Sequence, residues 1–211
     1  MSALSQRSLY AITDSTLLAG RLLESVEAAL RGGAAVVQYR DKSTDSARRA
    51  AEASALLALC RRYGCPLLIN DDVELAALIG ADGVHLGQTD GSLRLAREQL
   101  GPAAIIGATC HDSLAFADAA ATAGADYLAF GAFYASSTKP LAAPAQLATL
   151  RSARERFCLP VVAIGGITAD NAPPLLEAGA SALAVIADLW QATDIEARAR
   201  QYQRLFNRYP A

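Results

Sequence analysis

The chain has 211 residues and a formal net charge of −2; 53% of its residues are hydrophobic and 19% are charged. This composition provides enough apolar side chain for a sizeable core and argues against a disordered protein. Because the weak negative charge offers no basic surface, neither nucleic acid nor a membrane is expected as a partner.

We expect no targeting segment and no structural disulfide. Met1 to Arg7 lacks the apolar stretch of a signal peptide, and the longest apolar runs, such as Ala180 to Ala187, are too short to cross a bilayer. No CxxC spacing occurs, which predicts buried, reduced thiols at Cys60, Cys65, Cys110 and Cys158. These features predict a cytoplasmic protein.

Short apolar runs alternate with longer amphipathic stretches along the whole chain. Most of the short runs are continuously apolar, which is typical of parallel strands buried on both faces. The predicted strands are Leu9–Thr13, Ala35–Tyr39, Leu67–Ile69, Gly83–Leu86, Ile105–Ala108, Tyr127–Phe130, Val161–Ile164 and Ala182–Ile186.

Helical patterns lie between these runs, for example over Arg21–Arg31, Ser46–Tyr63 and Ser113–Ala123. Several of the helices are followed by glycine, which favours a left-handed helix end; these glycines include Gly33, Gly64, Gly124 and Gly179. Three similar tripeptides predict one recurring helix-to-strand corner: Gly80-Ala81-Asp82, Gly124-Ala125-Asp126 and Gly179-Ala180-Ser181.

Eight strand–helix units without a linker predict an α/β fold, a single-domain (β/α)8 TIM barrel over residues 1–211. The alternative is an open doubly wound sheet. That alternative is disfavoured because no glycine-rich dinucleotide fingerprint follows the Leu9–Thr13 run. In a barrel, functional residues are expected where the strands end.

A cluster of polar residues follows the Ala35–Tyr39 run, in the order Gln38-Tyr39-Arg40-Asp41-Lys42. Alternation along a strand directs Gln38, Arg40 and Lys42 to one side. An isolated Arg-x-Lys is more often a solvated strand end. Here the triplet directly follows a buried run, so its cations face the barrel mouth, which favours anion binding.

Carboxylates follow the next two runs. Asp72 is expected to cap the following helix, which leaves Asn70 and Asp71 at the rim. Asp90 is either a helix cap or a metal ligand, and the spacing leaves both roles open. Two carboxylates on adjacent loops suit Mg2+, which proteins hold with one or two carboxylates and substrate phosphates.

Hydroxyls and glycines follow the later runs. Thr109-Cys110-His111 ends one run, and Ser136-Ser137-Thr138-Lys139 forms a hydroxyl-rich loop with a lysine. The pair Gly165-Gly166 lets backbone N–H groups approach an anion, and the last run ends at Ile186-Ala187. One side of the mouth therefore suits a metal-bound diphosphate and the other a monophosphate, which indicates two phosphorylated small-molecule substrates.

These motifs resemble the thiamine phosphate synthase (thiamine-phosphate pyrophosphorylase) family over nearly the whole chain. The matching segments run from Tyr10-Ala11-Ile12-Thr13-Asp14 through Gly83-Val84-His85-Leu86-Gly87-Gln88 to Ala163-Ile164-Gly165-Gly166-Ile167. The resemblance implies a transferase that joins 4-amino-2-methyl-5-hydroxymethylpyrimidine diphosphate to 4-methyl-5-(2-phosphoethyl)thiazole or its carboxylated form. The products would be thiamine monophosphate and pyrophosphate.

The resemblance also implies residue roles. The Gln-x-Arg-x-Lys stretch would bind the pyrimidine diphosphate through Gln38, Tyr39, Arg40, Asp41 and Lys42, together with Asn70, Thr109 and Lys139. One Mg2+ per subunit would be held by Asp71 and Asp90. The thiazole phosphate would contact Ser136, Ser137, Thr138, Gly166, Ile186 and Ala187. Arg40, Lys42 and Lys139 would act catalytically, by stabilising charge on the departing pyrophosphate.

Two positions depart from the family pattern. Position 109 carries threonine where serine is common, which keeps the hydroxyl, and position 187 carries alanine where serine is usual, which leaves only a backbone N–H. His85 is expected to be structural, whereas the role of His111 stays open. The sequence leaves a homo-oligomer open as well.

Two rival functions share part of this motif set. A thiazole tautomerase has a similar fold and would use His111 as a proton carrier, but it would not need the retained cations and the carboxylates Asp71 and Asp90. A non-catalytic sensor of a phosphorylated ligand would need no pair of metal ligands either. The motifs therefore favour the transferase.

Overall fold

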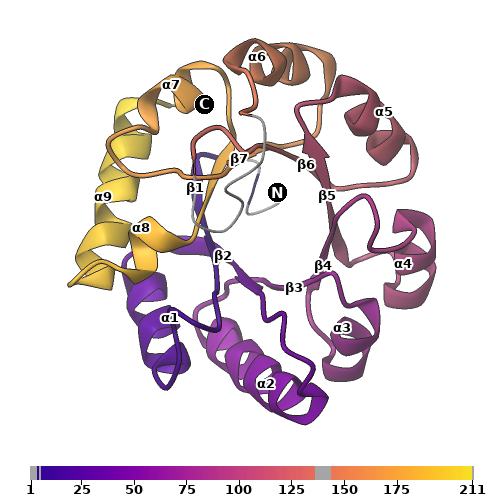
Figure 1. Ribbon diagram of the computed structural model, residues 1–211, viewed down its shortest axis with the longest axis vertical. Helices are drawn as coiled ribbons and strands as arrows, with labels where there is room; N and C mark the ends of the chain where they lie inside the picture. The colour runs from indigo at the N-terminus through magenta and orange to yellow at the C-terminus, as the bar shows by residue number, and fades with distance from the viewer. Residues whose placement is uncertain (1–3, 5, 136–143, 211) are drawn as a thin grey trace.

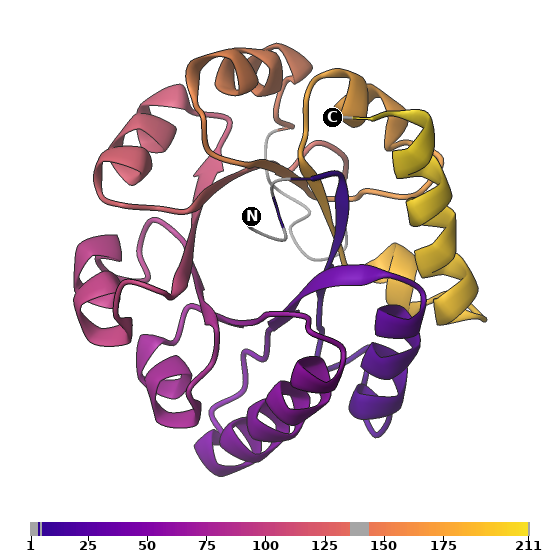
Figure 2. The ribbon, with the colours of Figure 1, turned by 180° about the vertical axis from the view of Figure 1, so that it is seen from behind.

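The computed structural model describes residue 4 and residues 6–135 and 144–210. Its parallel strands form a closed barrel in which each strand pairs with its neighbours in chain order, and β8 (Ala182–Val185) pairs with β1 (Ser8–Ile12). Helices surround the barrel on the outside (Figures 1 and 2). The predicted (β/α)8 barrel is confirmed, and the open sheet is excluded because the pairing of β8 with β1 leaves no edge.

The other strands are β2 (Ala34–Tyr39), β3 (Leu67–Asn70), β4 (Gly83–Leu86), β5 (Ile105–His111), β6 (Tyr127–Phe130) and β7 (Val161–Ile164). The helices are α1 (Leu22–Arg31), α2 (Ser46–Arg62), α3 (Val73–Ile79), α4 (Leu93–Leu100), α5 (Leu114–Thr122), α6 (Leu147–Arg156), α7 (Pro173–Glu177), α8 (Ala187–Trp190) and α9 (Ile195–Arg208). The main difference from the predicted strands is β5, which continues through Thr109 and Cys110 to His111.

Alternation along the strands divides the core into two parts. Leu9 and Ala11 of β1 pack into the larger cluster between the strands and the helices. Tyr10 and Ile12 belong to a smaller cluster with Tyr127. Successive side chains of a strand point to opposite faces, so the smaller cluster fills the barrel interior. The side chains of this smaller cluster form the layer directly below the residues at the barrel mouth.

The three similar tripeptides occupy one recurring corner, as predicted. In each, the third residue lies just before a strand and bonds to the start of the preceding strand. Its side chain accepts a hydrogen bond from a backbone N–H: Asp82 from Leu67, Asp126 from Ile106, and Ser181 from Val161. Its own N–H donates to the carbonyl of that same residue. The repeat therefore ties β3, β5 and β7 to the strands that follow them.

The predictions made for the glycines at helix ends and for the cysteines are largely confirmed. Gly33, Gly64, Gly124 and Gly179 all have positive φ at the ends of helices, which confirms the left-handed turns. All four cysteines are free thiols. Burial is confirmed for three of them, but Cys158 is exposed, because it lies after α6 in the turn that leads to β7 rather than within an element that packs into the core.

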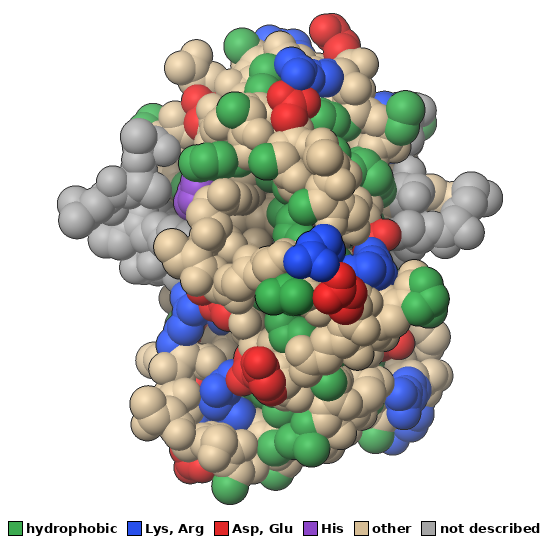
Figure 3. Space-filling view, turned by 90° about the vertical axis from the view of Figure 1, so that its right-hand side faces the viewer, with side chains coloured by type: hydrophobic (Ala, Val, Ile, Leu, Met, Phe, Trp, Pro, Cys, Tyr) green, Lys and Arg blue, Asp and Glu red, His purple; other side chains and the backbone are tan. Residues whose placement is uncertain are grey.

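The outer surface carries scattered apolar side chains. Leu78 of α3, Leu95 of α4 and Phe116 of α5 are 75%, 55% and 43% exposed. Figure 3 shows hydrophobic side chains dispersed among charged ones on one side of the barrel. Isolated exposed apolar residues are normal on soluble domains, so a homo-oligomer remains a prediction. Within the described part of the chain, no helix is long and apolar enough to cross a membrane.

Candidate active site

A cavity of about 630 Å3 lies at the carboxyl ends of the strands. Every strand contributes to its wall: Tyr10, Gln38, Asn70, His85, Thr109, Ala129, Ile164 and Ala184 come from β1 to β8 in order. The barrel interior below it is filled with side chains, so the cavity opens on the side of the loops that follow the strands. Functional residues of barrel enzymes occupy this position.

Most of the predicted site residues meet in this cavity. Its wall includes Gln38, Arg40, Lys42, Asn70, Asp71, Asp90, Thr109, Gly166, Ile186 and Ala187. Four further predicted residues, Ser136, Ser137, Thr138 and Lys139, lie outside the described residues. The structure therefore brings together residues from widely separated segments, as the positions of the strand ends predicted.

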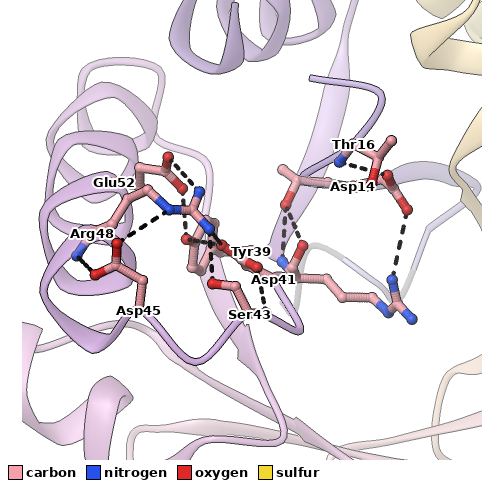
Figure 4. A network of polar contacts seen from close by, with 10 residues as sticks. Asp14, Thr16, Tyr39, Asp41, Ser43, Asp45, Arg48 and Glu52 are labelled. Atoms are coloured by element: carbon pink, nitrogen blue, oxygen red, sulfur yellow. Dashed lines mark hydrogen bonds and ion pairs between the residues drawn. The ribbon is translucent and has the colours of Figure 1, made fainter. Parts of the chain in front are cut away.

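Tyr39 and Asp41 are the predicted binding residues that the structure does not bring to the cavity wall. Both side chains turn toward α2 (Figure 4). The Tyr39 hydroxyl donates to Glu52 Oε2 at 2.7 Å, and Asp41 Oδ2 accepts from Arg48 Nη2 at 2.6 Å. Alternation explains the outcome, because residues 39 and 41 point away from the side that carries Gln38, Arg40 and Lys42.

Asp41 and Arg48 form an ion pair. Burial acts to raise the pKa of the Asp41 carboxyl, but hydrogen bonds from Ser43 and the charge of Arg48 outweigh it and lower that pKa. Asp41 thus stays ionised and anchors the loop after β2 to α2. This anchoring holds the neighbouring cations in place at the barrel mouth.

The two cations of the motif are held by carboxylates. Arg40 Nη1 lies 3.7 Å from Asp14 Oδ2, and the Arg40 backbone N–H donates to Thr13 Oγ1 at 2.9 Å. Lys42 forms an ion pair with Asp71 and is largely exposed. Asp14 was not predicted as a site residue, although its position directly after the first apolar run places it at the same rim.

The carboxylates divide between structural and site roles. Asp72 caps α3 as predicted, since its Oδ1 accepts from the Leu75 N–H at 2.8 Å. Asp90 is not a helix cap, because Ser92 caps α4. Instead, Asp90 Oδ2 accepts from the Gly87 N–H at 2.9 Å and lines the cavity. The structure therefore excludes the helix cap for Asp90, and its role as a metal ligand stays a prediction.

Asp71 and Asp90 are close enough to perturb one another. Burial and then the neighbouring Asp71 carboxyl raise the pKa of Asp90. Burial acts in the same direction on Asp71, but hydrogen bonds, from Lys42 foremost, outweigh it and lower the pKa of Asp71. Asn70 Nδ2 also donates to Asp71 Oδ2 at 2.6 Å. The pair therefore resists carrying two full negative charges without a counter-ion.

This donor set fits a hard divalent cation. Two facing carboxylates supply the oxygen ligands that Mg2+ prefers, with room in the cavity for phosphate oxygens to supply others. Among residues 4, 6–135 and 144–210, no group of three or more His, Cys, Asp and Glu side chains could hold a metal by itself. A cation here would thus depend on the ligand as well as the protein.

The opposite wall includes backbone that two glycines bring close to the cavity. Gly165 and Gly166 have φ of 104° and 62°. A Cβ on Gly166 would lie 2.5 Å from the carbonyl oxygen of Ala135 and 2.7 Å from that of Tyr134. Only glycine allows this close approach of the loops after β6 and β7. Ile186 and Ala187 complete this wall at the start of α8.

The floor of the cavity carries a hydrogen-bonded chain that the sequence did not reveal. Gln38 Nε2 donates to the Tyr10 hydroxyl at 2.6 Å, and the Tyr10 and Tyr127 hydroxyls lie 2.9 Å apart. His85 Nδ1 lies 2.8 Å from the Tyr127 hydroxyl, and His85 Nε2 lies 2.9 Å from Thr109 Oγ1. His85 was expected to be structural, and it links the barrel interior to the cavity wall. The sequence signal for this hydrogen-bonded chain is strand alternation, which directs both Tyr10 and Gln38 toward the barrel interior.

His111 lies at the end of β5, with φ of 52°, and lines the cavity. A register shift between Thr109 and His111 in the pairing with β6 accompanies this position. The ring contacts Phe116 edge-on at 6.3 Å between centroids. The geometry brings His111 to the cavity and leaves its role to experiment.

A closed parallel barrel with its polar residues gathered at the carboxyl ends of the strands defines a (β/α)8-barrel enzyme. The family model described as thiamine monophosphate synthase matches residues 9–189. The chain belongs to that family. It is a transferase of thiamine biosynthesis that acts on small molecules, and the family assignment made from the motifs is confirmed.

Comparison with individual relatives supports the same family. The chain is 58% identical over 202 residues to the thiamine-phosphate synthase of Thiobacillus denitrificans, covering 96% of each chain. It is 55% identical over 201 residues to that of Methylobacillus flagellatus, covering 95% of this chain and 96% of the relative. The solved thiamine phosphate pyrophosphorylase from Pyrococcus furiosus is similar at a TM-score of 0.88 and 34% identity, over 99% of this chain and 98% of that one.

Proposed function

We propose that the chain, acting as one barrel domain, couples 4-amino-2-methyl-5-hydroxymethylpyrimidine diphosphate with 4-methyl-5-(2-phosphoethyl)thiazole or its carboxylated form. The products are thiamine monophosphate and pyrophosphate, and the carboxylated form releases carbon dioxide in addition. The observation that carries the proposal is the division of one cavity into two unlike walls. Paired carboxylates and cations lie over β2 to β4, and a glycine-lined backbone wall lies over β7 and β8.

The diphosphate occupies the charged wall. Arg40 and Lys42 lie beside it as cations, with Lys139 assigned to the same group, and Asn70 offers an amide donor. In the free protein, Asp14 and Asp71 neutralise Arg40 and Lys42. A diphosphate would compete with those carboxylates for the same cations, which orients its charged end toward this wall.

Asp71 and Asp90 hold one Mg2+ per subunit in this proposal. Their mutual effect on pKa supports it, because a cation would relieve the repulsion between the two carboxylates. When bound, the ion neutralises charge on the phosphate oxygens. Lys42 would then be released from Asp71 to contact the diphosphate.

The substitution is dissociative. The bond between the pyrimidine methylene carbon and the diphosphate oxygen breaks, and the electron pair leaves with pyrophosphate. Arg40, Lys42 and Lys139 stabilise the charge that builds on the leaving group. The thiazole nitrogen then donates its electron pair to the methylene carbon to form the new bond. The step requires no protein nucleophile and no general base.

The thiazole monophosphate occupies the backbone wall. Gly166, Ile186 and Ala187 line it, and Ser136, Ser137 and Thr138 are assigned to the same subsite. Since Ala187 has no hydroxyl, its contribution is limited to its backbone. Backbone N–H groups can bind phosphate oxygens when a glycine brings the main chain close.

The test is to mix the purified protein with both phosphorylated substrates and Mg2+ and to measure thiamine monophosphate and pyrophosphate. We expect both products in equal amounts, and their loss in excess chelator with recovery on adding Mg2+. No product from either thiazole form would reject the proposed substrates. Full turnover in chelator would reject the metal. Cytoplasmic localisation remains a prediction from the sequence.

A further inference from the structure

Five side chains from five strands form one continuous hydrogen-bonded chain beneath the cavity: Gln38, Tyr10, Tyr127, His85 and Thr109. Its two ends, Gln38 and Thr109, line the cavity, and so do Tyr10 and His85. Tyr127 lies in the middle, is fully buried and is not part of the cavity wall. Its hydroxyl is the link between Tyr10 and His85.

The position of Tyr127 is built into the barrel. Tyr127 pairs in register with Gly107 of β5. A Cβ on Gly107 would lie 1.9 Å from Cζ of the Tyr127 ring and 2.2 Å from its hydroxyl oxygen. The ring therefore crosses space that any other residue at position 107 would fill, and it stacks on His85 with 5.6 Å between ring centroids.

One donor direction of this hydrogen-bonded chain satisfies every link and also gives the Tyr10 proton an acceptor within the chain. Burial raises the pKa of both the Tyr10 and Tyr127 hydroxyls, so each stays protonated and has one proton to donate. Gln38 Nε2 donates to Tyr10, which leaves the Tyr10 proton for Tyr127. The Tyr127 proton then goes to His85 Nδ1, and His85 Nε2–H donates to Thr109 Oγ1.

We propose that Tyr127 is a positioning residue: through His85 it fixes Thr109 as a hydrogen-bond donor toward the substrate, and through Tyr10 it fixes Gln38 as a hydrogen-bond acceptor. With Oγ1 already accepting from His85, Thr109 directs its own proton to a ligand acceptor. With Nε2 committed to Tyr10, Gln38 offers its Oε1 to a ligand donor. A ligand with a ring nitrogen as acceptor and an exocyclic amine as donor offers the complementary groups, so the inference rests on the proposed function for its substrate.

The donor direction can be tested without any substrate. The protein contains two histidines, so 15N-histidine labelling gives signals from two imidazole rings. A His111→Gln variant assigns each signal to its residue. We expect His85 in the free protein to be mainly the Nε2–H tautomer. In Tyr127→Phe, Nδ1 loses the hydroxyl that bonds to it, and we expect the Nδ1–H tautomer to become measurably populated.

A mainly Nδ1–H tautomer in the unmodified protein would overturn the inference, because His85 would then donate to Tyr127 and the donor order of the hydrogen bonds would be reversed. Equal tautomer populations with and without the Tyr127 hydroxyl would also overturn it. Should Tyr127→Phe fail to fold, the tautomer of His85 in the unmodified protein still tests the donor direction. These readouts stand even if the coupling assay gives no product, so failure of the proposed substrates is distinguishable.

Kinetics test the connection to the substrate. We expect Tyr127→Phe to raise KM for the pyrimidine diphosphate about tenfold while KM for the thiazole phosphate changes less than about twofold. In a Thr109→Val background, Tyr127→Phe should add little further, because both act through one hydroxyl. Multiplicative effects of the two substitutions, or equal rises in both KM values, would show a general structural role instead.

Discussion

The two walls of the cavity are built by different means. Over β2 to β4, the wall consists of charged side chains that bond to each other, including Lys42 with Asp71. Over β7 and β8, it includes backbone brought close by Gly165 and Gly166 in left-handed conformations, beside the side chains of Thr168, Asp188 and Gln191. The first wall depends on side-chain charge, and the second depends on the absence of a Cβ. The two proposed anion subsites should therefore fail in different ways.

The largest effect is expected from Asp71→Asn on the charged wall. Asp71 has φ of 64°, and asparagine tolerates this conformation well, so the fold should persist. Loss of the carboxylate should lower kcat by about a thousandfold or more, measured as thiamine monophosphate formation at saturating Mg2+. Asp45→Asn is a matched control, since Asp45 caps α2 on the surface. Activity within about tenfold of the unmodified protein would remove Asp71 from the metal site.

A second test separates stability from function at Asp90. Burial and then Asp71 raise the pKa of Asp90, so the folded protein binds this proton more tightly than the unfolded chain does. Ionised Asp90 therefore costs stability, and that cost diminishes as the pH falls through its raised pKa toward the ordinary value of about 4. Asp90→Asn should raise the Tm of the chelator-treated protein at neutral pH, while activity falls about a hundredfold.

The pH dependence provides the check on that prediction. The difference in Tm between Asp90→Asn and the unmodified protein should shrink on acidification, because the unmodified carboxyl then becomes protonated. Asp71 acts in the opposite sense: its pKa is lowered, so its contribution to stability is lost as the pH falls through the ordinary range and below it. A lower Tm for Asp90→Asn at neutral pH would contradict the assigned repulsion.

The backbone wall is tested by Gly166→Ala, for which a smaller effect is expected. The added Cβ would meet the carbonyl oxygens of Ala135 and Tyr134, which should displace the loop and raise KM for the thiazole phosphate about tenfold. KM for the diphosphate substrate should change little. Gly80→Ala is the matched control, because Gly80 has φ of 66° but nothing within 4 Å of an added Cβ. Equal KM effects in both variants would place the cause in general backbone strain.

The smallest effect is expected from His111→Ala. The proposed substitution needs no general base, so kcat should stay within about threefold of the unmodified value. A loss above about a thousandfold, or about 4 kcal/mol, would favour proton transfer by His111, as in a thiazole tautomerase. Assaying isomerisation of the thiazole phosphate in the same variant would decide between the two.

Much of the charged wall could be predicted because alternation along β2 is a local property. Gln38, Arg40 and Lys42 were directed to one face by their spacing, and all three line the cavity. The same rule places Tyr39 and Asp41 on the opposite face, where Glu52 and Arg48 bond to them. Assigning the whole stretch from the family motif therefore included two side chains that alternation separates from the cavity.

Strand limits were less predictable where a strand departs from regular pairing. The predicted strand ended at Ala108, whereas β5 continues to His111 through a register shift against β6. That shift depends on the partner strand and cannot be found in the local apolar pattern. Asp90 is a similar case, since only the position of Ser92 at the start of α4 showed that the cap was already supplied.

The sequence by itself determined the barrel and the corners between helices and strands, because apolar periods and glycine positions are local and repeat along the chain. It also determined the family, because the motifs at the strand ends are short and continuous. Only the tertiary structure decided which side chains meet. The carboxylate pair of Asp71 and Asp90 and the chain of hydroxyls through Tyr127 join residues far apart in sequence. Their interaction depends on closure of the barrel, which brings the ends of separate strands close together.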